Sequence, residues 1–483
     1  MGGCSIKAVM GLEVHVHLLT ESKLFCRCST DIEGKEPNSN TCPICIGFPG
    51  SKPMVNKKTI EHGIKISRAL NCTVQPEIQF SRKNYFYPDM SKNFQITQYE
   101  VPIGKGGYLN LDNRKIRIRR VHLEEDPAKL EHIGGNITNA KYTLIDYNRS
   151  GIPLVEIVTE PDVTSPKEAR LFLNKLSLIL EHLRVYDPSG EGSIRIDANI
   201  SLEGGQRVEM KNITGFRNVE NALNYEIIRQ KSMTNMGLKI ERETRHYDAE
   251  TNTTSTLRKK EQEEDYGYII EPDLVPIQVS PEWVKQLEAE MPELPDARIE
   301  RFTREYEIPK FQSGILINTG LDLSNFYENI LELYNQPILV ANWTVNFLLK
   351  SLNYEGLTLR NSSVSPETFV ELFELMDEGT ISERLAKELI KEYVSTGKSP
   401  RQIVKDRNLA MMREDELVEA VESVIKENPK AVEDYRDGRE KAVDYIIGQV
   451  LKKIKARASV QTVRKLVFNN LEKNDKRVKT YLN

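Results

Sequence analysis

Hydrophobic and polar positions follow different patterns in the two halves of the chain. Up to about residue 280, short runs alternate between apolar and polar positions and are broken by Gly, Pro, Asn and Asp, which is typical of strands and turns. Apolar spacings of three and four predict helices over 56–70, 165–183 and 218–236. Because hairpin-like neighbours outnumber alternating strand–helix units, we expect an α+β domain built on an antiparallel sheet.

The second half is predicted to be helical almost throughout. A serine followed by a proline or an acidic residue is a typical helix start, and such starts occur at Ser280, Ser365, Ser382 and Ser399. At about 150 residues per domain, 483 residues correspond to roughly three domains. We predict an α+β domain over 1–295, a helical connector over 296–408 and a helical tail over 409–483.

Residues 11–18 form an alternating segment with an unusual polar face. Glu13, His15 and His17 alternate with aliphatic residues, so one face of the predicted strand packs and the other presents a carboxylate and two imidazoles. Lys, Thr and Arg are the usual residues of a solvent-facing strand, whereas Glu and His are potential metal ligands. The pattern indicates metal binding, with an ordinary solvent face as the alternative.

Other segments repeat this alternation. Charged or amide side chains alternate with aliphatic ones in 193–202, 207–211 and 154–160, and an acidic run over 122–126 ends at Pro127, where a strand must stop. The polar positions concerned are Arg195, Asp197, Asn199, Glu209, Lys211, Glu156 and Glu125.

If these strands lie in one sheet, their polar faces converge. The common surface then carries Glu13, His15, Asp197 and Glu209, with Glu125 at its rim. Carboxylates crowd together only when cations neutralise them, and oxygen ligands with few imidazoles favour Mg²⁺ over Zn²⁺. Arg195, Lys211 and Arg149 are of the kind that neutralises phosphoryl groups. The combination predicts a Mg²⁺-assisted phosphoryl-transfer site, and the alternative is a merely polar sheet face.

A nucleotide site in this chain must be built on the sheet, because the sequence contains no P-loop and no glycine-rich dinucleotide motif. The segment 81–89 offers suitable side chains, since Arg82 and Lys83 precede Tyr85 and Tyr87. A ring beside a cation suits a nucleotide or an RNA terminus. The alternative is a strand whose rings fill the core.

Four of the six cysteines fall within twenty residues of one another. Cys26 and Cys28 lie at one end of a polar loop and Cys42 and Cys45 at the other, so that each pair can supply two thiolates to one tetrahedral ion. With all four positions taken by sulfur, the site is expected to be a closed, structural zinc site. The alternatives are redox thiols or cysteines that are close by chance.

The charge balance is nearly neutral overall, but it is uneven along the chain. There are 67 basic and 71 acidic residues, which give a net charge of −4. No apolar run is as long as a membrane span, so we expect a cytoplasmic protein. Residues 451–483 hold ten basic and two acidic side chains, a local charge of +8. This basic stretch is either a solvated helix face or a contact for nucleic-acid phosphates.

Taken in order, several long segments closely resemble the B subunits of heterotrimeric tRNA-dependent amidotransferases, the GatB family. The resemblance covers essentially the whole chain. The segments that carry it are the cysteine pairs and Gly11–Val16, Arg82–Asp89, His122–Asp126, Asp146–Asp162, Arg195–Ser201 and Val208–Asn212.

The resemblance implies a division of labour between three subunits. A partner A subunit releases ammonia from glutamine, and a small C subunit holds the complex together. This subunit uses ATP to phosphorylate the side-chain carboxylate of mischarged Asp-tRNA(Asn) or Glu-tRNA(Gln), and ammonia then displaces phosphate to give the amide. The resemblance also implies a catalytic sheet similar to those of glutamine synthetase and the guanido kinases.

By motif position, the resemblance assigns roles to individual residues. The Mg²⁺ ligands would be Glu13, His15, Glu125 and Glu209, with Asp197 and Glu156 as weaker candidates. Phosphate contacts would come from Lys211, Arg195 and Arg82, and the remaining substrate or ATP contacts from Lys83, Asn84, Tyr85, Tyr87, Asn148, Arg149 and Asn199. The family's tail packs against tRNA, which assigns contacts to Lys452, Lys453, Lys455 and Arg457.

Two other functions fit parts of the same pattern. The first is a zinc-stabilised tRNA-binding scaffold without its own chemistry, in which the polar sheet face only contacts phosphates. The second is a ligase similar to glutamine synthetase that acts on a small amino acid. Mg²⁺-dependent and tRNA-dependent ATP hydrolysis separates the first from the amidotransferase, and turnover without tRNA would identify the second.

Overall fold

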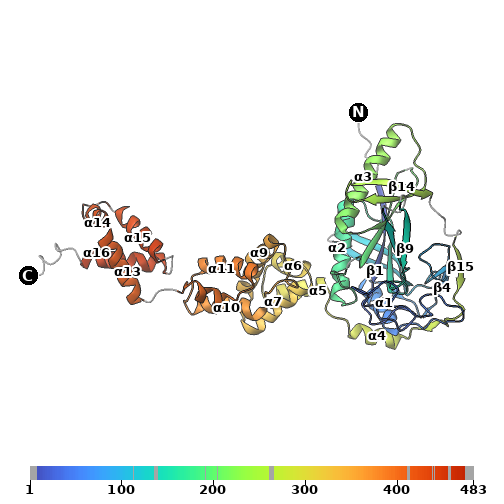
Figure 1. Ribbon diagram of the computed structural model, residues 1–483, viewed down its shortest axis with the longest axis horizontal. Helices are drawn as coiled ribbons and strands as arrows, with labels where there is room; N and C mark the ends of the chain where they lie inside the picture. Colours follow the sequence, from blue (N-terminus) through green and yellow to red (C-terminus); the bar gives the residue numbers. More distant parts are fainter. Residues whose placement is uncertain are drawn as a thin grey trace, which may run out of the picture. The chain divides into compact units, whose positions relative to one another are not determined.

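The computed structural model describes residues 8–111, 114–134, 140–190, 192–203, 205–259, 266–410, 414–437, 439, 441–454 and 458–473. The chain divides into two compact units, with the boundary between Ala297 and Arg298. The first unit is α+β and the second is helical, which confirms the predicted fold class (Figure 1). None of the helices in the described ranges has the length and apolar character needed to cross a membrane.

The first unit is built around a twelve-stranded sheet with the strand order β14-β13-β12-β11-β1-β10-β7-β5-β4-β15, in which β6 pairs with β7 and with β2. Neighbouring strands are antiparallel except β12 and β13, which are parallel. Two small ribbons, β16-β3 and β8-β9, lie outside this sheet. The strands are β1 (Ala8–His17), β2 (Thr73–Val74), β3 (Glu77–Ile78), β4 (Ser81–Asn84), β5 (Phe94–Thr97), β6 (Gly104–Leu111), β7 (Arg114–Glu125), β8 (Lys129–Ile133), β9 (Tyr142–Asp146), β10 (Pro153–Thr159), β11 (Ile194–Leu202), β12 (Val208–Ile213), β13 (Glu243–Asp248), β14 (Thr253–Lys259), β15 (Gly267–Ile270) and β16 (Ile277–Gln278).

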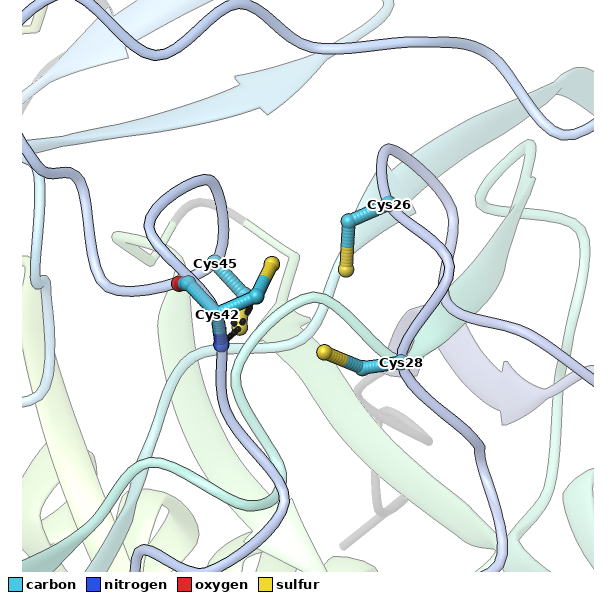
Figure 2. A group of neighbouring side chains, drawn as sticks. All are labelled: Cys26, Cys28, Cys42 and Cys45. Carbon is cyan, nitrogen blue, oxygen red and sulfur yellow. Dashed lines mark hydrogen bonds between the residues drawn. The ribbon is translucent and has the colours of Figure 1, made fainter.

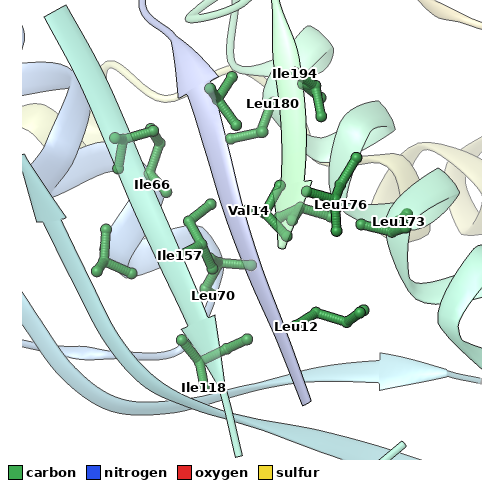
Figure 3. Close-up of a cluster of buried hydrophobic side chains, with 14 of the residues drawn as sticks. Leu12, Val14, Ile66, Leu70, Ile118, Ile157, Leu173, Leu176, Leu180 and Ile194 are labelled. Atoms are coloured by element: carbon green, nitrogen blue, oxygen red, sulfur yellow. The ribbon is translucent and has the colours of Figure 1, made fainter. Parts of the chain in front are cut away.

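Helices cover one face of this sheet. They are α1 (Lys57–Ala69), α2 (Pro166–His182) and α3 (Phe216–Asn235), close to the three predicted helices, and α4 (Pro281–Ala289) packs against α1. The apolar positions of the alternating strands and of these helices form one buried cluster, which includes Leu12, Val14 and Ile157 of the strands and Leu173 and Leu176 of α2 (Figure 3). Burial of this stripe forces the alternate positions of the same strands onto the opposite face.

The second unit consists of helices. They are α5 (Pro295–Glu305), which begins just before the boundary, α6 (Lys310–Asn318), α7 (Leu321–Leu333), α8 (Pro337–Trp343), η2 (Thr344–Leu348), α9 (Leu349–Glu355), α10 (Pro366–Asp377), α11 (Glu383–Thr396), α12 (Pro400–Asp406), α13 (Glu414–Glu427), α14 (Pro429–Arg436), α15 (Lys441–Lys453) and α16 (Val460–Lys473).

The predicted serine caps are present. The side chains of Ser280, Ser365, Ser382 and Ser399 each accept a hydrogen bond from the backbone three residues on, which satisfies a free N–H of the first turn. Helices α13 to α16 share an apolar cluster of their own between Leu417 and Leu471. The three-domain division of the whole chain stays a prediction.

Candidate functional site

Five neighbouring strands bring the polar positions predicted from the sequence onto one surface. The strands are neighbours in the order β12-β11-β1-β10-β7. Glu209 of β12 lies opposite Asn199 of β11, and Asp197 of β11 lies opposite Glu13 of β1. His15 of β1 lies opposite Arg195 of β11 on one side and opposite Glu156 of β10 on the other. Residues directly opposite in antiparallel strands point to the same side of the sheet. We call this surface the polar face. It carries Glu13, His15, Arg120, His122, Glu124, Glu156, Arg195, Asp197, Asn199, Glu209 and Lys211.

One group of possible metal ligands on the polar face centres on His15. Its Nε2 lies 3.3 Å from Glu156 Oε2 and 3.6 Å from Glu124 Oε1, and Glu156 Oε2 is also 3.0 Å from His122 Nε2. His15, Glu124 and Glu156 each place a ligand atom within 4.8 Å of the others, so they form a group that could hold an ion.

A second group consists of Glu13, Asp197 and Glu209, whose carboxylate oxygens also lie within 4.8 Å of one another. Lys211 Nζ is 2.7 Å from Asp197 Oδ2 and 3.3 Å from Glu209 Oε1. The Asn199 amide donates a 3.0 Å hydrogen bond to Glu13. Three carboxylates therefore share one lysine, which leaves an excess of negative charge.

The pKa values of these groups reflect that excess. Burial raises the pKa of Glu13, and the nearby Glu156, Asp197 and Glu209 raise it further. Burial alone would lower the pKa of His15, but the carboxylates of Glu156 and Glu124 outweigh it and raise the pKa to about 9. The crowded carboxylates thus leave negative charge that a divalent cation would compensate, and their oxygen donors fit Mg²⁺.

Asp126, just beyond the end of β7, holds the cations next to these groups. Its side chain is fully buried, accepts a 2.6 Å hydrogen bond from Arg195 Nη2, and lies 2.7 Å from His17 Nε2 and 3.4 Å from Arg149 Nε. Although burial opposes ionisation, Arg195, His17 and Arg149 together outweigh it and lower the pKa of Asp126. His17 is therefore a partner of Asp126 and lies outside both groups of possible ligands.

Two residues predicted for the site make other contacts. Glu125 Oε1 accepts hydrogen bonds from Lys92 and from the Ile96 backbone, and it is Glu124 that joins His15. Asn148 is buried against the cysteine loop, where its side chain bonds Asn40 and Glu36.

Arg82 is occupied by an acidic partner. It forms two 2.8 Å hydrogen bonds with Glu271, and its guanidinium lies over the Phe94 ring. A phosphate contact by Arg82 would therefore require this ion pair to open. The side chain of Asn84, its neighbour in β4, donates to the Gly267 backbone.

Aromatic side chains gather along the β4 and β15 edge. Lys83 Nζ lies 4.6 Å from the centre of the Tyr266 ring, and Tyr266 packs edge-on against Tyr85 at 5.7 Å. Tyr99 stacks on Tyr268 at 3.9 Å. Sequence patterns missed these partners because β15 is nearly 200 residues from β4 in the chain, and no local signal indicates that the two strands pair.

The four cysteine side chains point toward one centre (Figure 2). Their sulfur atoms all lie within 4.8 Å of one another, where a tetrahedral ion with bonds of about 2.3 Å needs separations of about 3.8 Å. Hydrogen bonding from Cys26 lowers the pKa of the Cys45 thiol to about 5, with help from the Cys42 backbone N–H and the Lys23 charge. The group is thus positioned to bind a metal ion.

Comparison with known families decides where the chain belongs. The model of the GatB/GatE catalytic domain matches residues 8–285, and that of the GatB domain matches residues 325–471. The chain belongs to the GatB family. The match to the GatB/GatE catalytic domain includes the whole polar face and the four cysteines, so both lie in the part that family members share.

Curated members of the GatB family resemble the chain over nearly its full length. One is named as the B subunit of the aspartyl/glutamyl-tRNA(Asn/Gln) amidotransferase of Saccharolobus solfataricus. It is 46% identical over 468 residues, which are 96% of this chain and 99% of that protein. Proteins with the same name from Thermodesulfovibrio yellowstonii and Methanospirillum hungatei are 46% and 45% identical, covering 96% and 97% of this chain and 99% of each relative.

Proposed function

We propose that the chain is the B subunit of a tRNA-dependent amidotransferase and that it carries out the ATP-dependent activation step. It phosphorylates the side-chain carboxylate of mischarged Asp-tRNA(Asn), Glu-tRNA(Gln) or both, and ammonia then converts the acyl phosphate to the amide. The observation that carries the proposal is the polar face, where two groups of acidic side chains lie beside Lys211 and Arg195 in a chain of the GatB family.

The polar face suits phosphoryl transfer because its charges lie where phosphates need them. The Glu13 group and the His15 group would hold Mg²⁺, which when bound neutralises the phosphates of ATP. Asp197 and Glu209 fix the ammonium group of Lys211, and Asp126 fixes the guanidinium of Arg195. Both cations are thereby oriented before substrate arrives, which lowers the cost of stabilising charge in the transition state.

The remaining roles are assigned to partners and to other parts of the chain. Ammonia is supplied by an A subunit, and a C subunit completes a heterotrimer that works in the cytoplasm. The four cysteines hold a structural Zn²⁺. Among the predicted tRNA contacts of the tail, Lys452 is exposed and Lys453 pairs with Glu427, while Lys455 and Arg457 lie outside the described residues.

Substitution of one carboxylate from the Glu13 group tests the catalytic role. In the complete complex, Glu13→Gln and Glu209→Gln should each reduce tRNA amidation by at least about 100-fold, because each removes a charge that the metal and phosphates require. Release of ammonia from glutamine by the partner should stay measurable. An exposed carboxylate of the same unit, as in Glu250→Gln, serves as the control.

Two results would count against this function. Normal amidation by both variants would show that the polar face takes no part in the reaction. Amidation without ATP hydrolysis in this subunit would instead support the tRNA-binding scaffold. Separate assays with Asp-tRNA(Asn) and Glu-tRNA(Gln) would establish which of the two is the substrate.

A further inference from the structure

Arg120 is a basic residue on the polar face that faces the acidic groups without belonging to them. It lies two residues before His122 in β7 and opposite Val158 in β10, and Val158 lies opposite Glu13 in β1. Since opposite residues share a face, Arg120 and Glu13 point to the same side, two strand spacings or about 10 Å apart.

The neighbouring arginines of β7 all have acidic partners, but Arg120 does not. Arg114 lies 3.2 Å from Glu168, Arg117 lies 2.7 Å from Asp162, and Arg119 lies 2.9 Å from Glu160. Across the described ranges no carboxylate is within ion-pair distance of Arg120, and its buried Nε has no hydrogen-bond partner. A buried donor without a partner costs free energy, so an acceptor from outside the chain would stabilise it.

The surroundings of Arg120 combine an aromatic pair with the His15 group. Burial raises the pKa of Tyr268, the charge of Glu156 raises it further, and the charge of Arg120 opposes this. Tyr268 stacks on Tyr99 with the ring planes only 10° apart. Arg120 therefore lies on the same face of the sheet as the carboxylates of the His15 group, and its charge acts on one ring of the stacked pair.

We propose that Arg120 binds the side-chain carboxylate of the aminoacyl group that is to be phosphorylated. This inference rests on the proposed function and adds the residue that recognises the acidic side chain. An anionic substrate is repelled by the carboxylates of the polar face unless a cation neutralises it. Lys211 and Arg195 are already paired with acidic side chains, whereas the planar guanidinium of Arg120 is available for a carboxylate.

The chemistry of the step is compatible with this contact. With one carboxylate oxygen held by Arg120, the other forms a bond to the γ-phosphorus of ATP. The bond between that phosphorus and the bridging oxygen breaks, and ADP leaves with the electron pair. Arg120 has no proton to give or take in this step, so it acts by charge and by orientation.

The test compares Arg120→Gln and Arg120→Lys with Arg119→Gln in the complete complex. Arg119 is the matched control because it is adjacent, exposed and paired with Glu160. Amidation is measured with ammonium chloride as the nitrogen source, so that glutamine hydrolysis does not enter. We expect kcat to fall by about 10- to 100-fold in Arg120→Gln and less in Arg120→Lys, which keeps the charge but not the planar fork. The KM for ATP and the affinity for tRNA should change by less than about twofold, because most of the tRNA affinity comes from phosphate contacts elsewhere.

Each other outcome overturns the inference. Equal activity of Arg120→Gln and Arg119→Gln would show that Arg120 does not touch the substrate. A raised KM for ATP with unchanged kcat at saturating ATP would show that Arg120 contacts a phosphate of ATP and not the substrate carboxylate. If Arg120→Gln does not fold, Arg120→Lys decides, and its full activity would overturn the inference because loss of the planar fork should lower kcat. A wild-type complex with no ATP-dependent amidation would reject the proposed function itself, and this inference with it.

Discussion

At the scale of single residues, Asp126 links the cations of the site into one buried network. It contacts Arg195, Arg149 and His17, and its backbone N–H and C=O bond Ile152 and Gly151. A buried carboxylate with two guanidinium partners is stable only as a set, because removing one member leaves an uncompensated charge in a dry environment. Asp126 is therefore expected to position Arg195 without touching the substrate.

Asp126→Asn tests this network through stability and its pH dependence. At pH 7 we expect a loss of about 3 kcal/mol in the free energy of unfolding, because Arg195 loses its buried counter-charge. The pKa of Asp126 is lowered in the folded chain, so the advantage of wild type is fully present above the unfolded-state value of about 3.9. It is lost as the pH falls through the lower folded-state pKa.

Denaturant titrations at several pH values measure this difference. Asp162→Asn is the matched control, since Asp162 pairs with Arg117 at the surface and its loss should cost less than about 1 kcal/mol. A difference between wild type and Asp126→Asn that does not shrink as the pH falls below about 3.9 would contradict the assignment.

At the scale of elements, the cysteine loop fastens the segments that lead into the polar face. The Cys45 backbone carbonyl accepts hydrogen bonds from Ser91 and Ser150, and Asn40 bonds Asn148. These contacts connect the loop to the turn between β9 and β10 and to the segment before β5. Loss of a metal from the cysteines should therefore loosen both segments.

Zinc analysis tests the role of the loop. We expect about one zinc ion per chain after dialysis, and Cys42→Ser should lose it and lower Tm by at least about 5 °C, because a closed thiolate site contributes to folding. Cys72→Ala is the matched control, since Cys72 is a buried cysteine that does not belong to the group of four. Zinc content of zero in wild type, or unchanged zinc content in Cys42→Ser, would refute the proposal.

At the scale of the whole molecule, the charge of the chain is distributed between parts with different tasks. The acidic groups lie on the polar face of the first unit, whereas residues 451–483 carry a local charge of +8. Helices α13 to α16 have an apolar cluster of their own, so the tail keeps its own core. The near-neutral net charge therefore conceals a basic stretch at the end of the chain, which the proposed function assigns to tRNA contact.

Deletion of residues 409–483 tests whether the tail contacts tRNA. Up to four phosphate contacts would be lost, so the slope of log affinity against log salt concentration should become shallower by roughly 0.7 to 0.9 for each contact. Lys452→Ala alone should have a larger effect than Lys453→Ala, because Lys453 is paired with Glu427. Filter binding at several salt concentrations gives both quantities, and an unchanged slope after the deletion would exclude the contacts.

Much of the architecture could be predicted because its signals are local. The alternation of Glu13 and His15 with aliphatic residues, the serine caps and the helical spacings act within a few residues, and the structure confirms the strands and helices that they predict. The choice between Glu124 and Glu125 could not be made in this way, because either side chain fits an acidic strand end. Only pairing with β10 shows that Glu124, in step with His122, faces His15.

By itself, the sequence determined which residues alternate and where helices begin, because backbone geometry sets these patterns over a few residues. It also determined that the chain resembles the GatB family, because the motifs that carry the resemblance are long and occur in order along the chain. Only the tertiary structure decided which alternating faces adjoin, that Tyr99 stacks on Tyr268, and that Arg120 has no acidic partner among the described residues. These features depend on the order and register of strands that are far apart in the chain. That order is set by packing of the whole core, which no local pattern encodes.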